Sequence, residues 1–356
     1  MGGRLILPVG YPAPAREARR ALWLAQLRHR GWQTTVYTPD VPAVDAPLKQ
    51  AGIDLRHLPF RGLTDYSTIR HLSKHLEREA QGAAIITQSY RSAFIALCAR
   101  KLASRPDMHV ALLDRTLKQP ATTWLARRVY RNLSAIIFTS HSGLEIFHSA
   151  ERVYGKALTP PERLHVVMEG VGTAPEPLEE PKGPIMALYN GELRAGSGLE
   201  RLIDALESLR GKRLRLMIAG QGRPDYMDAL RRRAISRGVM DMISWRRERP
   251  LLSEVAAQCH FGIFPYEGER FSDGNIELMA AGRPQIVTDN GIAREYLGND
   301  GGAIYASGIE AMCEAMLNLS SDAAKRRESG EEARRRYRAT LNPEQSLEAI
   351  EKILSQ

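Results

Sequence analysis

The chain has 356 residues, of which 43% are hydrophobic and 26% charged, and its formal net charge is +9. That length suits two domains better than one, and the composition is ordinary for a globular protein. No apolar run reaches the roughly 18 residues of a membrane span, the first run is too short for a signal peptide, and the three cysteines are too far apart to indicate a disulfide framework or a zinc site, so we expect a cytoplasmic protein.

Short apolar runs recur along the chain, and a helical pattern follows each of them. They cover residues 5–9, 34–38, 83–87, 110–114, 135–139 and 164–168, and then 185–189, 214–219, 242–245, 261–265, 285–289 and 303–305. Continuous apolar strands that alternate with amphipathic helices indicate parallel sheets covered on both faces. We therefore expect an α/β protein with two doubly wound, Rossmann-like domains that face a cleft. Ligands in such sheets bind beyond the carboxyl ends of the strands.

The stretch GVGTAPEPLEEPKGP at 170–184 has four prolines and no periodicity, which is typical of a linker. It separates an N-terminal domain, expected at residues 1–172, from a C-terminal domain at 183–340. Residues 341–356 are predicted to form a C-terminal helix after a break near Asn342-Pro343. We expect this helix to pack back toward the N-terminal domain.

The stretch GERFSDGNIELMAAGRP at 268–284 carries the clearest chemical signal. A loop over 267–274 is predicted to open a helix over 275–281, which ends at Gly282. Amides in the first turn of such a helix bind phosphate well. Glu269 and Glu277 would repel phosphate, so they must serve other groups, and a carboxylate readily accepts hydrogen bonds from hydroxyls. A ligand with a diphosphate and sugar hydroxyls, a nucleotide sugar, satisfies both requirements.

The spacing Glu269-x7-Glu277, followed by LMAAGRPQIVTDNGIARE, resembles the E-x7-E signature of retaining, family 4-like glycosyltransferases of the GT-B fold. Other segments run in register with that family. YNGELRAGSGLERLIDAL (189–206) is similar to the first strand, phosphate loop and helix of its donor domain, and LRLMIAGQGRPDYMDALRRRA (214–234) to the second strand and helix. AIIFTSHSGLEIF (135–147) and ERLHVVMEGV (162–171) resemble the last strands before its linker.

This resemblance implies roles for individual residues. Glu277 would bind the ribose hydroxyls of the donor, and Glu269 would contact the hydroxyls of the donor sugar. The base would lie near WRRER (245–249), which includes Arg249, and Gly10 would allow a close backbone approach to the ligand. The diphosphate and sugar would lie near the following residues: Gly191, Phe271, Ser272, Asp273, Gly274, Asn275 and Ile276.

The chain departs from the family pattern where the diphosphate is expected. The family usually has an Arg and a Lys at the positions of Glu192 and Ser197, and those cations neutralise the leaving group without a metal. We keep Ser197 among the candidate donor contacts. The missing charge could come from one of four arginines, the first of which is nearest in sequence: Arg194, Arg223, Arg249 or Arg270. Otherwise the enzyme is slow, uses an unusual donor, or has lost activity.

Two residues of the N-terminal half follow strand-like runs. Where the family commonly has a histidine near the reacting sugar, this chain has Asp114. Asp114 could have a polar role beside the transferred sugar or act on the acceptor hydroxyl, or it could cap a helix or turn. His141, in TSHSG, is predicted to start a helix rather than to act chemically.

The positive charge is concentrated in the N-terminal half, where residues 1–177 hold 24 Lys and Arg against 14 Asp and Glu. Such asymmetry indicates an anionic partner. We expect an anionic membrane surface, with each cation contributing roughly 1 kcal/mol. The alternatives are a solvated charged face and a phosphate-rich soluble acceptor. The expected membrane or acceptor face comprises Arg16, Arg19, Arg20, Trp124, Arg127, Arg128, Tyr130 and Arg131.

The resemblance thus implies a retaining glycosyltransferase of the hexosyltransferase class. It would move a sugar from a nucleotide diphosphate sugar to a hydroxyl of a cell-envelope, lipid-linked or polysaccharide acceptor. The enzyme would work without a cofactor or a metal, in the cytoplasm or peripherally on the inner face of the membrane. The alternative is an inactive GT-B module that binds nucleotide or glycan without turnover. A nucleic-acid partner is not expected, because basic charge alone supports it.

Overall fold

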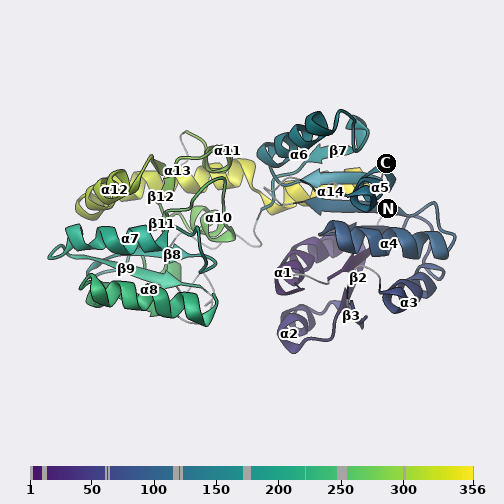
Figure 1. Cartoon of the computed structure of the whole chain (residues 1–356), viewed down its shortest axis with the longest axis horizontal. Coiled ribbons are helices and arrows are strands. Elements are labelled where there is room, and N and C mark those ends of the chain that lie inside the picture. Colours follow the sequence, from purple (N-terminus) through teal and green to yellow (C-terminus); the bar gives the residue numbers. More distant parts are fainter. Residues whose placement is uncertain are drawn as a thin grey trace. The chain divides into compact units, whose positions relative to one another are not determined.

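The computed structural model describes residues 3–9, 14–60, 62, 65–114, 120, 123–170, 178–220, 222–246, 255–299 and 302–355, with the backbone alone for 14–17, 19, 43 and 154. The chain forms two compact units (Figure 1). The first unit comprises Met1–Glu169 together with Glu344–Gln356, and the second comprises Gly170–Pro343. The first unit therefore contains both the beginning and the end of the chain.

The first unit is built on a seven-stranded sheet in the order β3-β2-β1-β4-β5-β6-β7. Every pair of neighbouring strands is parallel. Its strands are β1 (Arg4–Pro8), β2 (Gln33–Thr38), β3 (Asp54–His57), β4 (Ala84–Thr87), β5 (His109–Asp114), β6 (Ala135–Phe138) and β7 (Leu164–Val166). Its helices are α1 (Pro14–Leu24), α2 (Pro42–Gln50), α3 (Tyr66–Leu76), α4 (Tyr90–Leu102), α5 (Trp124–Asn132), α6 (His141–Tyr154) and α14 (Pro343–Leu354).

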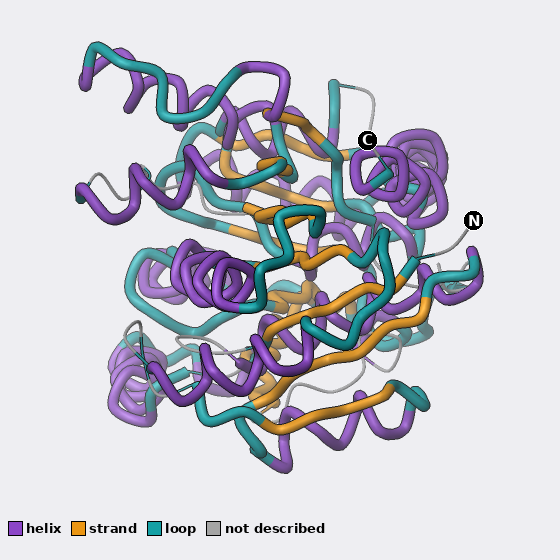
Figure 2. Tube along the Cα trace, turned by 90° about the vertical axis from the view of Figure 1, so that its right-hand side faces the viewer, coloured by secondary structure: helices purple, strands orange, loops and turns teal. Residues whose placement is uncertain are grey.

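Alternate strand residues of the first unit pack on opposite faces of the sheet, as strand geometry requires. Ile6 belongs to the core cluster that includes Leu72 of α3, whereas Leu5 belongs to the cluster that includes Leu24 of α1 and Ile350 of α14. Figure 2 shows the strands side by side with helices on both faces. The last helix of the chain thus completes one of the two hydrophobic layers of the first unit.

The second unit contains a six-stranded parallel sheet in the order β10-β9-β8-β11-β12-β13. Its strands are β8 (Ile185–Asn190), β9 (Leu214–Ala219), β10 (Ile243–Arg246), β11 (Phe261–Phe264), β12 (Gln285–Thr288) and β13 (Ala303–Ala306). Its helices are α7 (Leu199–Ala205), α8 (Pro224–Ser236), α10 (Asp273–Ala280), α11 (Gly291–Leu297), α12 (Ile309–Ser321) and α13 (Ala323–Thr340). Helix α7 contacts α8 and α12, and α10 contacts α13.

The described residues also include four short 3-10 helices, η1 (Ala25–Arg30), η2 (Pro161–Arg163), η3 (Leu206–Leu209) and η4 (Met240–Met242). The predicted fold class is confirmed, and each predicted apolar run overlaps a strand. Strand β3 was not predicted, because DLRH at the edge of the sheet has no buried residue and hence no apolar run. Helix α10 begins at Asp273, two residues before its predicted start. Residues 171–177 of the predicted linker lie outside the described residues.

Candidate functional site

The loops after β8, β9 and β11 approach one another closely at the carboxyl edge of the second sheet. A Cβ on Gly220 would lie 1.9 Å from the carbonyl oxygen of Gly191, and one on Gly198 would lie 1.7 Å from that of Pro265. Gly220 and Gly198 also have φ angles of 154° and 76°. Only glycine tolerates both conditions. Strands β8 and β11 are neighbours at which the strand order reverses, the place where such sheets bind ligands.

The N-terminus of α10 lies against the end of β8. A Cβ on Gly274 would come within 2.3 Å of the carbonyl oxygen of Asn190, so glycine lets helix and strand meet. Asn275 Oδ1 accepts hydrogen bonds from the Ser272 amide at 3.1 Å and the Ser272 hydroxyl at 2.9 Å. Buried Gln285 exchanges two 2.8 Å hydrogen bonds with Asn275. These contacts fix the first turn, whose amides lack partners inside the helix and can bind an anion.

Asn190 is a residue of this site that sequence reasoning missed. Its side chain is only 2% exposed, and its Oδ1 atom has no hydrogen-bond partner among the described residues. Leaving a buried polar atom unsatisfied costs about 1–3 kcal/mol, so such atoms usually meet water or a ligand. The sequence signal was an asparagine at the end of the apolar run 185–189.

Glu269 is exposed, and its carboxylate has a defined structural partner. Its two oxygens accept hydrogen bonds from the backbone amides of Gly291, at 3.1 Å, and Ile292, at 3.0 Å, at the start of α11. Asn290 caps the same helix by accepting the Ala293 amide at 2.8 Å. Each carboxylate oxygen keeps a lone pair for a further donor. Glu269 is thus fixed in one orientation within the loop that precedes α10.

Glu277 lies one turn into α10 and is half-buried. Its neighbours in the motif have mainly structural contacts. The ring of Phe271 stacks on Tyr296 with 4.5 Å between centroids, which leaves its backbone as the part expected near the donor. Asp273 begins the helix and is half-buried, while Gly274, Asn275 and Ile276 are buried. Their backbone, rather than their side chains, is therefore what the first turn offers to a ligand.

The two departures from the family pattern differ in structure. The Glu192 carboxylate accepts a hydrogen bond from Arg194 Nε at 2.8 Å, so these exposed side chains neutralise each other. Ser197 is 1% exposed, and its hydroxyl lies 3.0 Å from that of Tyr226. This hydroxyl joins the loop to α8, and the expected contact of Ser197 with the donor stays a prediction.

Arg270 is the cation that the structure brings to this loop. Its Nη1 donates a 3.4 Å hydrogen bond to the carbonyl of Ala195, and a Cβ on Gly196 would lie 2.8 Å from the same nitrogen. No carboxylate of the described residues lies within 4 Å of its guanidinium. Arg223, by contrast, is paired with Asp225 at 2.8 Å. Asn290 Nδ2 donates to the carbonyls of Gly268 and Arg270, at 3.2 Å and 3.4 Å, and so restrains the segment.

Other predicted residues lie in the first unit or outside the described residues. Gly10 and Arg249 lie outside the described residues. Asp114 ends β5, is half-buried, and its carbonyl accepts the Thr139 amide at 3.2 Å. His141 starts α6, as predicted, after its cap Ser140.

Some residues of the expected basic face are exposed as predicted, and others are buried. Trp124 is 67% exposed, with Arg128 5.5 Å from its ring centroid, and Arg127 and Arg131 are exposed too. Arg20, however, is buried 3.9 Å from the Glu169 carboxylate, and Tyr130 is buried against Phe147. Neither can reach a surface partner. Arg16 and Arg19 lie on α1, where their side chains are outside the described residues.

One cluster of the first unit has the residue types of a metal site. Ligand atoms of Asp40, Asp45 and His57 lie within 4.8 Å of one another. Thr38 accounts for part of this arrangement, because its hydroxyl lies 2.7 Å from Asp45 Oδ1 and 3.0 Å from His57 Nδ1.

Within the ranges described, no helix is long and apolar enough to cross a membrane.

Two family models match consecutive parts of the chain. Residues 17–170 match the "Glycosyl transferase 4-like domain", and residues 172–336 match "Glycosyl transferases group 1". A GDP-mannose-dependent alpha-(1-6)-phosphatidylinositol dimannoside mannosyltransferase of Mycobacterium tuberculosis is 28% identical over 139 residues. That match covers 38% of this chain and only 36% of the relative.

Solved structures resemble the chain along its whole length. Anabaena HepE in complex with UDP-glucose has a TM-score of 0.81 at 15% identity, covering 99% of both chains. A glycosyltransferase from Rickettsia africae has a TM-score of 0.80 at 14% identity, covering 99% of this chain and 98% of its own. At this identity the likeness shows the fold, and the two family models show the family. The chain therefore belongs to the glycosyltransferases and has the GT-B fold, with a glycosyl transferase 4-like domain followed by a group 1 domain.

Proposed function

We propose that this chain is a retaining glycosyltransferase that binds a nucleotide diphosphate sugar in the second unit and an acceptor hydroxyl in the first. The observation that carries the proposal is the N-terminus of α10, which Gly274 lets approach the end of β8, with Glu269 and Glu277 before and after it. A helix N-terminus suits the diphosphate, and the carboxylates suit hydroxyls.

Each group of the donor then has a proposed partner. The diphosphate binds the first-turn amides of α10 and the guanidinium of Arg270, which replaces the two cations of the family pattern. Glu277 accepts the ribose hydroxyls. Glu269, held by the amides of Gly291 and Ile292, accepts a hydroxyl of the sugar with its remaining lone pairs. We place the base near residues 245–249.

The proposed reaction breaks the bond between the anomeric carbon and the diphosphate oxygen. The acceptor oxygen bonds to the same face of that carbon and its proton passes to the departing diphosphate, so configuration is retained. Charge grows on the diphosphate as the bond breaks, and preorganised donors stabilise such charge strongly. Asp114 is the candidate for orienting the acceptor or the transferred sugar.

The relatives support the donor class and suggest an acceptor. HepE binds UDP-glucose, and the matched mycobacterial enzyme is GDP-mannose-dependent, so both use a nucleotide diphosphate sugar. The latter acts on a phosphatidylinositol dimannoside. We propose a cell-envelope, lipid-linked or polysaccharide acceptor for this chain. The exposed Trp124, Arg127, Arg128 and Arg131 would contact the anionic inner face of the cell membrane.

The first experiment measures the thermal stability of the whole chain with UDP, GDP and ADP. A nucleotide at about a hundredfold excess over its dissociation constant stabilises a protein by about 2.7 kcal/mol. We expect one of the three nucleotides to raise the unfolding temperature, and we expect Glu277→Gln to abolish that increase. Glu314→Gln, an exposed glutamate of α12, is the matched control. A chain that responds to none of the three would contradict the proposed donor site.

The second experiment offers the matching nucleotide sugars and follows product formation and anomeric configuration by NMR. Turnover with retained configuration, lost in Glu269→Gln, is the expected result. A product of inverted configuration would overturn the retaining mechanism.

An inactive binding module is the second candidate function. It is favoured by the internal pairing of Glu192 with Arg194 and by the buried hydroxyl of Ser197, which leave fewer charges for a leaving group than the family pattern has. Nucleotide binding that depends on Glu277, without turnover of any donor sugar, would support this candidate over the enzyme.

A further inference from the structure

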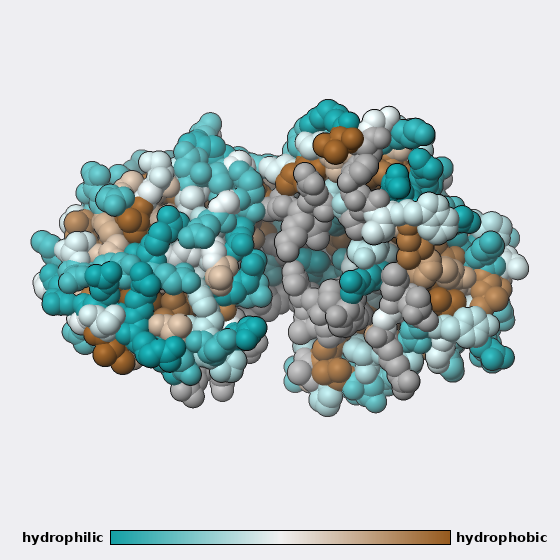
Figure 3. Space-filling model, viewed as in Figure 1, coloured by the Kyte–Doolittle hydropathy of each residue, from teal (hydrophilic) through white to brown (hydrophobic). Residues whose placement is uncertain are grey.

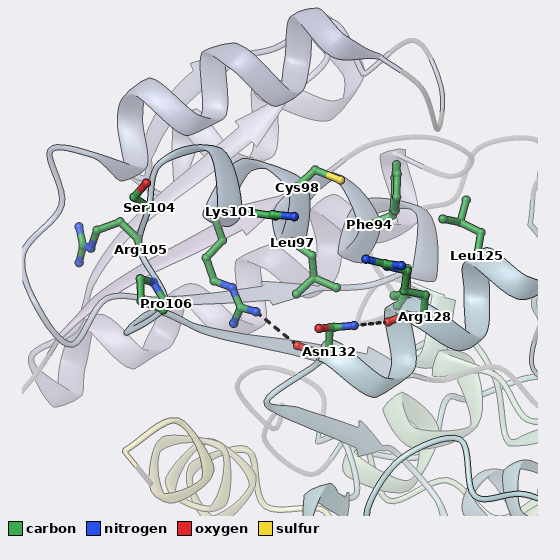
Figure 4. Close-up of a pocket in the computed structure, with 12 residues that line it drawn as sticks. Phe94, Leu97, Cys98, Lys101, Ser104, Arg105, Pro106, Leu125, Arg128 and Asn132 are labelled. Atoms are coloured by element: carbon green, nitrogen blue, oxygen red, sulfur yellow. Dashed lines mark hydrogen bonds between the residues drawn. The ribbon is translucent and has the colours of Figure 1, made fainter.

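A cavity of about 420 Å³ lies between α4 and α5 in the first unit. Figure 4 shows Phe94, Leu97, Cys98 and Lys101 of α4 on one side and Leu125, Arg128 and Asn132 of α5 on the other. Pockets of this size commonly bind small molecules. None of the residues assigned above to the donor lines it.

The floor of the cavity is apolar. Phe94, Leu97 and Val129 belong to or pack against the hydrophobic core of the first unit, and Leu125 also lines the cavity. Figure 3 shows hydrophobic residues at the surface in the region where Figure 1 labels α4. An apolar ligand segment in this cavity would therefore contact side chains that belong to or pack against the core.

The rim is cationic and has no balancing acid on either helix. Helices α4 (YRSAFIALCARKL) and α5 (WLARRVYRN) contain six Lys or Arg and no Asp or Glu. Arg100 donates to the carbonyls of Met108 and Asn132, and Arg105 is paired with Asp107 at 2.8 Å. Lys101 and Arg128 are exposed, and neither has a carboxylate within 4 Å among the described residues.

We propose that the α4–α5 cavity binds one acyl chain of an anionic phospholipid, whose phosphate lies between Lys101 and Arg128. An apolar floor lined at its rim by two cations matches the tail and head of such a lipid, whereas a sugar or a free phosphate would leave the floor unused. The exposed indole of Trp124, at the start of α5, suits the membrane interface. The inference rests on the proposed membrane contact of the first unit and assigns it a binding site.

The test uses the whole chain and vesicles of phosphatidylcholine, alone or mixed with phosphatidylglycerol in equal parts. Sedimentation measures binding, and alkylation of Cys98 by iodoacetamide, followed by mass spectrometry, measures occupancy of the cavity. Cys313 in the second unit is the internal reference, because it is half-buried like Cys98 and burial raises the pKa of both thiols. When the concentration of mixed lipid is about four times the dissociation constant, Cys98 should react with iodoacetamide about fivefold more slowly, and Cys313 should react at its usual rate.

Lys101→Gln/Arg128→Gln should weaken binding to the mixed vesicles about thirtyfold, since two cations near an anionic surface are lost. Lys212→Gln/Arg232→Gln removes the same charge from the second unit and should change little. Binding without protection of Cys98 would keep the membrane contact and overturn the cavity site. No binding to either vesicle would overturn both. Protection by phosphatidylcholine alone, or equally by inorganic phosphate, would contradict an anionic lipid as the ligand.

Discussion

Arg270 shows that neighbouring carboxylates decide whether the charge of an arginine is available to a ligand. Three described arginines could replace the missing cations, but Arg194 is paired with Glu192 and Arg223 with Asp225. Arg270 alone among these three lies against the loop of Gly196 without a carboxylate in reach among the described residues. A paired guanidinium contributes little net field to a bound diphosphate, which is why we propose Arg270 as the source of that charge.

We predict that Arg270→Gln weakens nucleotide diphosphate binding about tenfold to hundredfold. A hydrogen bond to a charged group is worth about 1.5–3 kcal/mol, and each 1.4 kcal/mol is tenfold in affinity. Isothermal titration calorimetry measures the change. Arg223→Gln, the same substitution at a paired arginine, should bind as the wild type does. Equal affinity in Arg270→Gln would assign the phosphate charge to another group.

Asn190 supplies a second prediction at this scale. Because its Oδ1 atom is buried and unpaired among the described residues, the apolar replacement Asn190→Leu of similar size should raise the unfolding temperature or leave it unchanged. Nucleotide affinity should fall about tenfold if the side chain completes its hydrogen bonds with the donor. Thermal melts with and without nucleotide measure both effects. A destabilised variant with normal affinity would mean that Asn190 has a purely structural role.

The sequence predicted single residues best where an element fixed their place. His141 starts a helix because Ser140 caps it. Arg20 and Tyr130 could not be placed, because helical spacing gives the face of a helix but not the partner that covers it. Glu169, far away in the chain, buries Arg20, and Phe147 of α6 covers Tyr130. The same limit hid the hydrogen bond between Ser197 and Tyr226.

Elements were predicted well where burial on both faces produced a continuous apolar run. The exception is β3, an edge strand with no such run. The start of α10 was predicted late, because Asp273 and Gly274 are typical loop residues. Their helical conformation is supported by the local capping contact of Asn275 with Ser272 and by the tertiary contact of Asn275 with Gln285, of which the local sequence does not reveal the second.

The contact between α10 and β8 leads to a prediction about elements. In Gly274→Ala the new methyl group would lie 2.3 Å from the carbonyl oxygen of Asn190, so the helix must move away from the strand. We expect a loss of about 1–3 kcal/mol in stability, typical of overpacking, and a loss of nucleotide binding. Gly308→Ala is the control, because a methyl group there meets only Glu310 at 3.5 Å. Retained binding in Gly274→Ala would remove this helix N-terminus from the donor site.

At the scale of the whole molecule, the chain returns to its first unit through α14. The carboxylate of Glu351 accepts two hydrogen bonds, one from Arg30 Nε at 2.5 Å and one from Trp32 Nε1 at 3.1 Å. The hydrogen bond from Arg30 is the largest cause that lowers the pKa of Glu351 below its ordinary 4.5. A lowered pKa stabilises the folded state above the unfolded pKa, and this contribution is lost as the pH falls through the folded value.

We therefore predict that wild type is more stable than Glu351→Gln at neutral pH. The difference between them should shrink as the pH falls below about 4.5. Thermal melts of both proteins across this range measure it. Glu344→Gln, at the start of the same helix, serves as the comparison. A difference that stays constant with pH would show that the charge of Glu351 contributes nothing.

The apolar face of α14 should matter more than this ion pair. Leu347, Ile350, Ile353 and Leu354 all lie in the core layer that contains Leu5 and Leu24. Ile350 is 0% exposed, so Ile350→Ala should cost the first unit about 2–5 kcal/mol. Ile235 of α8 is 64% exposed, and Ile235→Ala should change stability by less than about 0.5 kcal/mol.

Calorimetry can assign the loss to one unit, because a bound nucleotide raises only the transition of the unit that binds it. Ile350→Ala should lower the transition that nucleotide leaves unchanged. If both transitions fell together, the two units would unfold as one, and the last helix would stabilise the donor site as well as the first unit.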